Sequence, residues 1–147
     1  MLIIGELING MDQRVAAAIK EKNKDFIRAL ARKQLDAGAD ALDVNCGPAS
    51  RDAAADMRWL VGTIREEASC VLSLDSTKPD AIEAGLETSS KKCMINSTSA
   101  DISRLETYVA MAKKYKASLV ALVMDHKGVP QDKDGKLELA AQILSFA

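Results

Sequence analysis

Two short apolar runs end in side chains that could bind a polar ligand. "LSLDST" ends its apolar run at Asp75, and "CMINST" ends the next one at Asn96. A carboxylate directly after a buried run is costly without a partner, so Asp75 is expected to bind a ligand. Asn96 offers both a donor and an acceptor, which suits the edge of a heterocycle better than a simple ion.

Further polar residues occupy corresponding positions along the chain. They are Glu6 and Asn9 in "GELING", Asp43 and Asn45 in "DVNCGP", and Asp125 in "VMD". Any one of them could instead cap a helix or anchor a turn. As a set at the ends of successive apolar runs, they favour one ligand site.

The elements that would position these residues alternate between strand and helix patterns. Strands are predicted over 2–8, 41–46, 70–75, 93–96 and 118–125, and helical spacing covers 11–38, 51–68, 79–88, 101–116 and 137–147. This alternation predicts an α/β fold with right-handed crossovers and a parallel sheet. Polar residues at every strand end favour a TIM (β/α)8 barrel over a doubly wound sheet, which concentrates its site at one switch point. A barrel needs about 250 residues, so the chain is expected to hold about five of eight units.

Composition and motifs argue against several classes of function. The chain of 147 residues has a formal net charge of -1 and a pI near 5.9, which leaves no electrostatic footprint for nucleic acid or an anionic membrane. Phosphate-binding glycine motifs are missing. Three scattered cysteines and a single histidine, His126, predict no metal site and fit a reducing cytoplasm. The apolar start "MLIIGELING" resembles neither a signal peptide nor a membrane span.

Five motifs together resemble one protein family in order and spacing. They are "GELING", "ALDVNCGP", "LSLDSTKPDAIEAGL", "MINSTSA" and "LVMDHKGVP". The chain is similar over essentially its whole length to the pterin-binding methyltetrahydrofolate methyltransferases, including those that act on corrinoid/iron–sulfur proteins and in corrinoid-dependent demethylation. The resemblance implies a TIM barrel that holds the pterin at the carboxyl ends of its strands.

The resemblance also implies roles for particular residues. Asp75 and Asn96 would hydrogen-bond the pterin ring, and Asn96 and Asp125 are the catalytic candidates. Asp125 stands where some relatives have Asn, near the reacting side of the pterin. The remaining substrate-binding positions would be Asn9, Asp43, Asn45 and Ser97. A further pterin-binding Asp and an Asn near N5 belong to family strands beyond Ala147, so we expect residues 1–147 to be a truncated pterin-binding domain, inactive alone.

The implied reaction moves a methyl group between N5 of tetrahydrofolate and a corrinoid. No D-x-H-x-x-G corrinoid signature is present, so the cobalamin is expected on a partner protein. Uncovered sheet edges predict self-association, and a homodimer is expected. Two alternatives stay open: a dihydropteroate-synthase-like condensing enzyme, and a non-catalytic pterin-binding fragment.

Overall fold

The structure, a computed structural model, describes residues 1–147 and alternates strands with helices throughout. The strands are β1 (Ile4–Asn9), β2 (Ala41–Asn45), β3 (Val71–Asp75), β4 (Cys93–Thr98) and β5 (Ser118–Ala121). The helices are α1 (Gln13–Glu21), α2 (Lys24–Asp36), α3 (Ala53–Arg65), α4 (Pro79–Thr88), α5 (Ile102–Tyr115) and α6 (Lys133–Phe146). No helix combines the length and the apolar character needed to cross a membrane.

The five strands form one sheet in the order β1-β2-β3-β4-β5, which is also their order in the sequence. β1 pairs with β2, and β2 with β3, in parallel. A doubly wound sheet would reverse its strand order at a switch point, whereas successive βα units of a barrel do not. The predicted α/β class and barrel-type succession of five βα units are confirmed.

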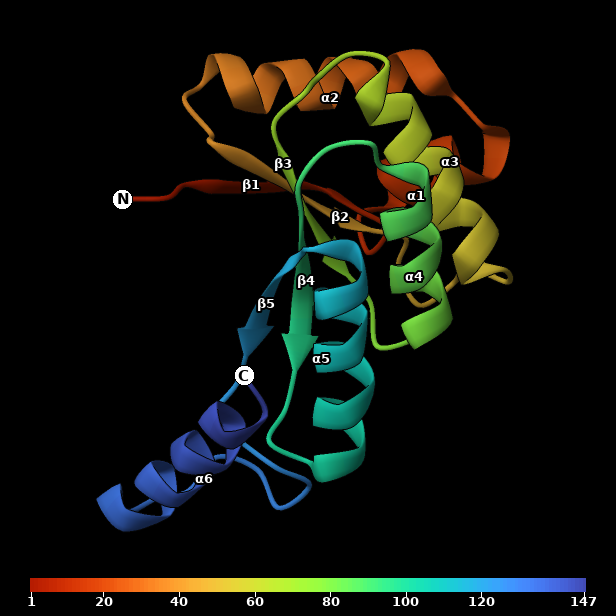
Figure 1. The fold of residues 1–147 in the computed structure, drawn as a ribbon. Coiled ribbons are helices and arrows are strands. Elements are labelled where there is room, and N and C mark those ends of the chain that lie inside the picture. Colours follow the sequence, from red (N-terminus) through yellow and green to blue (C-terminus); the bar gives the residue numbers. More distant parts are fainter. The chain divides into compact units, whose positions relative to one another are not determined.

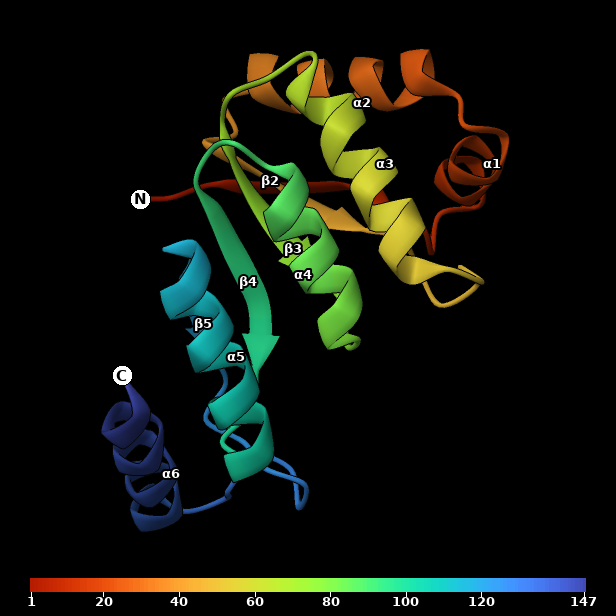
Figure 2. The same cartoon turned by 45° about the vertical axis from the view of Figure 1, so that its right-hand side comes forward.

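The chain consists of two compact units, Met1–Met94 and Ile95–Ala147. In the first unit, α2, α3 and α4 lie on one side of β1, β2 and β3 (Figure 1, Figure 2). Leu42, Val44, Leu72 and Leu74 are completely buried. A Cβ built on Gly85 of α4 would lie 2.9 Å from Cδ1 of Leu74, so this side chain faces the helices. Because strand residues alternate between faces, the residues between these leucines and valines face the opposite side.

One helix predicted over residues 11–38 is two helices in the structure. Lys22 adopts a left-handed conformation with φ of 55° and ends α1. Asn23 then starts α2, with its Oδ1 accepting from the backbone N of Phe26 at 3.1 Å. Asn is a strong N-cap residue, and the intervening "EKNKD" has no apolar residue to hold a continuous helix on the core.

The second unit contains two further differences from the predicted boundaries. β5 ends at Ala121, not at Asp125, because the backbone then turns and Asp125 pairs with Gly128 in an isolated antiparallel bridge. α6 begins at Lys133, four residues before the predicted start. Asp132 explains this early start, since its Oδ1 accepts from the backbone N of Gly135 at 2.7 Å as an N-cap.

Candidate functional site

Three of the predicted site residues are the last residues of neighbouring strands. Asn9 ends β1, Asn45 ends β2 and Asp75 ends β3. Asn9 and Asn45 are register partners across the β1–β2 pair. Asn45 and Asp75 follow Val44 and Leu74, which belong to the buried helix-facing set, so both lie on the opposite face of the sheet. The first unit thus brings amide and carboxylate groups together at the carboxyl edge of its strands.

Asn45 positions the other groups of this edge. Its Nδ2 donates to Oδ2 of Asp75 at 2.7 Å, and its Oδ1 accepts from the backbone N of Gly47 at 2.6 Å. The first bond fixes the Asp75 carboxylate and the second fixes the following loop in an Asx turn. Both polar groups of Asn45 therefore have protein partners, so its main role is to orient Asp75.

Two glycines allow the loops after β1 and β2 to approach each other. The backbone N of Gly10 donates to the carbonyl of Asn45 at 2.8 Å, and a Cβ on Gly10 would overlap the Cys46 carbonyl. Gly47 has a φ of 78°, and a Cβ there would lie 2.6 Å from the Gly10 backbone. Asn9 completes the arrangement with an Asx turn, in which its Oδ1 accepts from Met11 N at 2.9 Å. The glycines of "GELING" and "NCGP" thus serve backbone packing beneath the site.

Asp75 retains hydrogen-bonding capacity after its contact with Asn45. The residue is half-buried, and its second oxygen, Oδ1, takes no hydrogen bond from the protein. An ionised carboxylate accepts at both oxygens, so Oδ1 and the remaining lone pair of Oδ2 can receive N–H donors from a ligand. Two adjacent N–H groups of a heterocycle match this geometry.

Ser73 is a buried polar residue of β3 that the sequence reasoning did not single out. It lies two residues before Asp75 on the same strand face and is paired in register with Asp43. Ser73 is fully buried and its Oγ has no hydrogen-bond partner, although most buried polar side chains have one. Asp43, at 5% exposure, lies in the middle of β2 rather than at its end. The sequence signal that could have indicated this arrangement is two polar residues separated by one apolar residue. "DVN" and "SLD" both have this spacing, which places the two polar side chains of each strand on the same face.

The other predicted residues belong to the second unit. Asn96 and Ser97 lie within β4, and Nη2 of Arg104 donates to the Ser97 carbonyl at 3.2 Å. Asp125 lies beyond β5, where its Oδ1 accepts from Lys127 N at 2.8 Å and closes the turn. Of the two catalytic candidates, Asn96 is thus on a strand and Asp125 is on a loop.

Beside Asp125, the single histidine contacts the start of α5. Nδ1 of His126 lies 3.1 Å from Oδ1 of Asp101, and the Ser99 hydroxyl donates to Oδ2 of Asp101 at 2.6 Å. These bonds, the one from Ser99 foremost, hold the pKa of Asp101 below its ordinary value. The His126 side chain is 72% exposed, so it is largely solvated apart from its contact with Asp101.

The cysteines and acids do not form a reactive or metal-binding group. Burial raises the pKa of the Cys46 thiol, so Cys46 is a poor nucleophile near neutral pH. No three His, Cys, Asp or Glu side chains are arranged to hold a metal ion. The strand-end groups themselves, Asn9, Asn45 and Asp75, offer hydrogen-bond donors and acceptors.

Comparison with known proteins agrees with this chemistry. The chain is 30% identical, over its whole length, to a methylcorrinoid:tetrahydrofolate methyltransferase from Eubacterium limosum, of which it covers 55%. It is 29% identical to a methionine synthase from Mycobacterium tuberculosis and 30% identical to one from Mycobacterium leprae, over 99% of the chain and 13% and 12% of those proteins. The chain thus spans about half the length of the first relative. The family model described as pterin binding enzyme matches residues 5–145, and the chain belongs to this family.

Proposed function

We propose that the protein is a methyltransferase that moves a methyl group between N5 of tetrahydrofolate and a protein-bound corrinoid. Membership of the pterin binding enzymes supports the ligand class. The reaction is proposed from the names of the relatives, a methylcorrinoid:tetrahydrofolate methyltransferase and two methionine synthases.

The observation that carries the proposal is the oriented carboxylate of Asp75. The 2-amino and N3–H groups of a pterin are adjacent donors, and the Asp75 carboxylate is held by Asn45 with Oδ1 open. In this proposal Asp75 binds the pterin, and Asn45 orients the Asp75 carboxylate.

The pterin must also be oriented at its reacting nitrogen. Transfer from N5 is difficult because the departing amine is a poor leaving group, and a hydrogen bond or proton at N5 lowers the charge that develops there. The resemblance assigns Asn96 to the pterin ring and Asp125 to its reacting side, so these two residues remain the catalytic candidates. The corrinoid, on a partner protein, donates or accepts the methyl group.

A binding experiment tests the proposal at the level of the ligand. Calorimetric titration should detect binding of methyltetrahydrofolate and of tetrahydrofolate. p-Aminobenzoylglutamate, which has no pterin, is the control and should not bind, because the proposed contacts are all to the ring. Equal binding of the control would place the contacts outside the pterin and contradict the proposal.

The expected partners are tested separately. Methyl transfer with a corrinoid protein, followed by the absorbance of the corrinoid, tests the reaction in the whole protein. The homodimer remains a prediction, and light scattering would refute it by showing a monomer at all concentrations.

A further inference from the structure

Arg104 of α5 reaches back to the end of β4. Nη2 of its guanidinium donates to the carbonyl of Ser97 at 3.2 Å, and no other hydrogen bond involves this side chain. Ser97 directly follows Asn96, one of the two catalytic candidates, in the same strand. The three residues all belong to the second unit of the chain. The hydrogen bond of Arg104 therefore acts on the backbone of a segment that carries two predicted site residues.

The Arg104 side chain is itself held in place. It is half-buried, and its guanidinium carbon lies 5.0 Å from the centroid of the Tyr108 ring, one turn further along α5. Tyr108 is 1% exposed, so the ring beneath the guanidinium is fixed by its burial. A cation over an aromatic face is attracted to the ring, and the planar guanidinium stacks there in a defined orientation. Arg104 is thus a constrained donor rather than a mobile surface cation.

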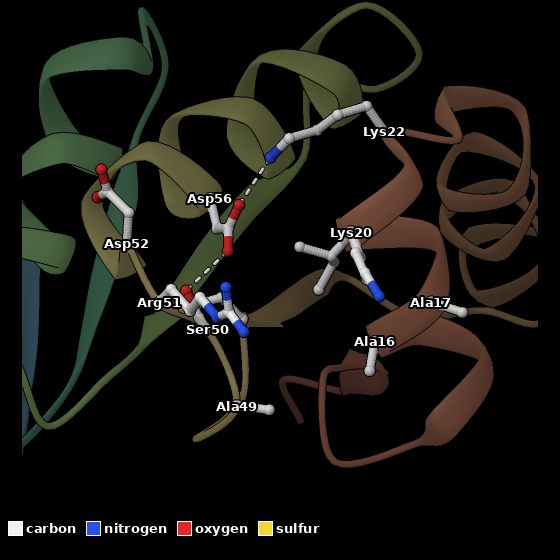
Figure 3. A pocket seen from close by; sticks show the side chains of 11 residues that line it. Ala16, Ala17, Lys20, Lys22, Ala49, Ser50, Arg51, Asp52 and Asp56 are labelled. Carbon is white, nitrogen blue, oxygen red and sulfur yellow. Dashed lines mark hydrogen bonds and ion pairs between the residues drawn. The ribbon is translucent and has the colours of Figure 1, made fainter.

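Other cations of the chain pair with carboxylates near the surface. Figure 3 shows Lys22 beside a cavity between α1 and the loop that leads from β2 to α3, where its Nζ donates to Oδ1 of Asp56 at 2.6 Å. Arg32 of α2 pairs with Glu67 at 2.7 Å. Both pairs connect elements of the helical layer with one another. Arg104 has no carboxylate partner, so its charge is directed at the strand.

Arg65 of α3 makes bonds of the same kind as Arg104, but at the other edge of the sheet. Its Nη1 donates to the Cys70 carbonyl at 2.6 Å and its Nη2 to the Lys92 carbonyl at 3.3 Å, directly before β3 and β4 begin. In (β/α)8 barrels the amino ends of the strands serve stability, whereas the carboxyl ends carry the active site. The bond of Arg104 lies at the carboxyl end of β4, which points to a role in the site.

We propose that Arg104 is a positioning residue, which holds the end of β4 so that Asn96 meets the ligand in one orientation. The backbone after Ser97 is fixed by β5, because the Thr98 carbonyl accepts from Leu122 N at 2.9 Å. Arg104 adds the second tether, and a side chain that orients a ligand must be held to within about 0.5 Å. The role toward the ligand rests on the proposed function, whereas the fixing of the strand end does not.

The first arm of the test measures the strand end without any folate. Arg104→Met keeps the apolar stem of the side chain and removes the donor. Hydrogen exchange of the Leu122 amide, which bonds to the Thr98 carbonyl, should then become about threefold to tenfold faster, because the strand end opens more often. Arg65→Met is the matched control, since it loses bonds to backbone carbonyls at the other edge and should leave this amide unchanged.

The second arm measures the affinity of the whole protein for methyltetrahydrofolate by calorimetric titration. Arg104→Met should weaken binding about threefold to tenfold, less than the loss of a direct charge-assisted bond would. Arg104→Lys keeps a charged donor and should bind more tightly than Arg104→Met. In an Asn96→Ala background, Arg104→Met should weaken binding less than about twofold, because the side chain that it positions is gone. Arg65→Met should bind with native affinity.

Four results would overturn the inference. They are native exchange of the Leu122 amide in Arg104→Met, native folate affinity in that variant, equal affinities of the Arg104→Met and Arg104→Lys variants, or an equal loss with and without Asn96. Faster exchange in a protein that binds no folate would instead contradict the proposed function and leave the fixing of the strand end intact. Circular dichroism confirms that each variant is folded, and Arg58→Met, which loses only a surface pair with Glu87, serves as the control if Arg65→Met is not.

Discussion

The bond between Asn45 and Asp75 predicts that these two residues act as one energetic unit. Asn45→Ala removes a hydrogen bond to a carboxylate, worth about 1.5–3 kcal/mol, and a neutral one to Gly47 N, worth about 0.5–1.5 kcal/mol. Both side chains are only half-buried, so the lower ends of these ranges apply, and the expected loss is about 2 kcal/mol. Asp75→Ala loses only the shared bond and should cost about 1.5 kcal/mol.

A double-mutant cycle measured by urea unfolding tests this unit. Both single variants lose the bond between Asn45 and Asp75, but the double variant loses it only once. The loss of unfolding free energy in the double variant should therefore be smaller than the sum of the two single losses by about 1–1.5 kcal/mol. Asn45→Ala combined with Asp36→Ala is the control, because Asp36 is an exposed residue at the end of α2 with no side-chain partner. Additivity within about 0.5 kcal/mol for Asn45 and Asp75 would refute the reasoning.

Three further predictions concern packing, pH dependence and thiol reactivity. Gly85→Ala should destabilise the protein by about 1–3 kcal/mol, because the new Cβ would crowd the core. Gly62→Ala should stabilise it by up to about 1 kcal/mol, because the nearest atom to the new Cβ is 3.9 Å away. Thermal melts in which both variants shift the melting temperature in the same direction would contradict this packing. Asp101 has a pKa below its ordinary 3.8, so its contribution to stability is present above this pH and is lost as the pH falls below it. In Asp101→Asn, the free energy of unfolding should therefore depend less on pH at acidic pH than in the native protein. An unchanged dependence on acidic pH would count against the contacts of this carboxylate. At pH 8, iodoacetamide should modify the half-buried Cys70 before the buried Cys46, and peptide mass spectrometry showing the reverse order would dispute that burial.

Much of the fold could be predicted because each βα unit carries its own local signals. Pro79 at the first position of α4 marks the start of that helix, and the prediction of 79–88 matches its bounds. The division of the segment 11–38 was missed, because apolar residues recur at helical spacing on both sides of "EKNKD" and the break itself is marked only by this polar run and the cap at Asn23. β5 was predicted too long, since the apolar residues of "LVM" beyond Ala121 look like strand but form a bend before the turn at Asp125 and Gly128.

The candidate site was predicted in its residue types more fully than in its geometry. Asn9, Asn45 and Asp75 lie at strand ends, as polar residues after apolar runs indicate. The pairing of Asn45 with Asp75 depends on the register of two strands separated by a helix, which spacing alone does not fix. The sequence did not single out Ser73 as a buried polar residue, because one serine in an apolar run looks like a small core residue and only its orphaned hydroxyl distinguishes it.

The central claim is that Asp75 binds the pterin through charge-assisted hydrogen bonds. Calorimetric titration of methyltetrahydrofolate into the native protein, Asp75→Ala, Asn96→Ala and the charge control Asp36→Ala tests it most directly. Charge-assisted bonds are worth about 1.5–3 kcal/mol and neutral ones about 0.5–1.5 kcal/mol, so Asp75→Ala should weaken binding more than Asn96→Ala. Asp36→Ala should leave the affinity unchanged. Native affinity in a folded Asp75→Ala variant would contradict the account and reduce Asp75 to a structural partner of Asn45.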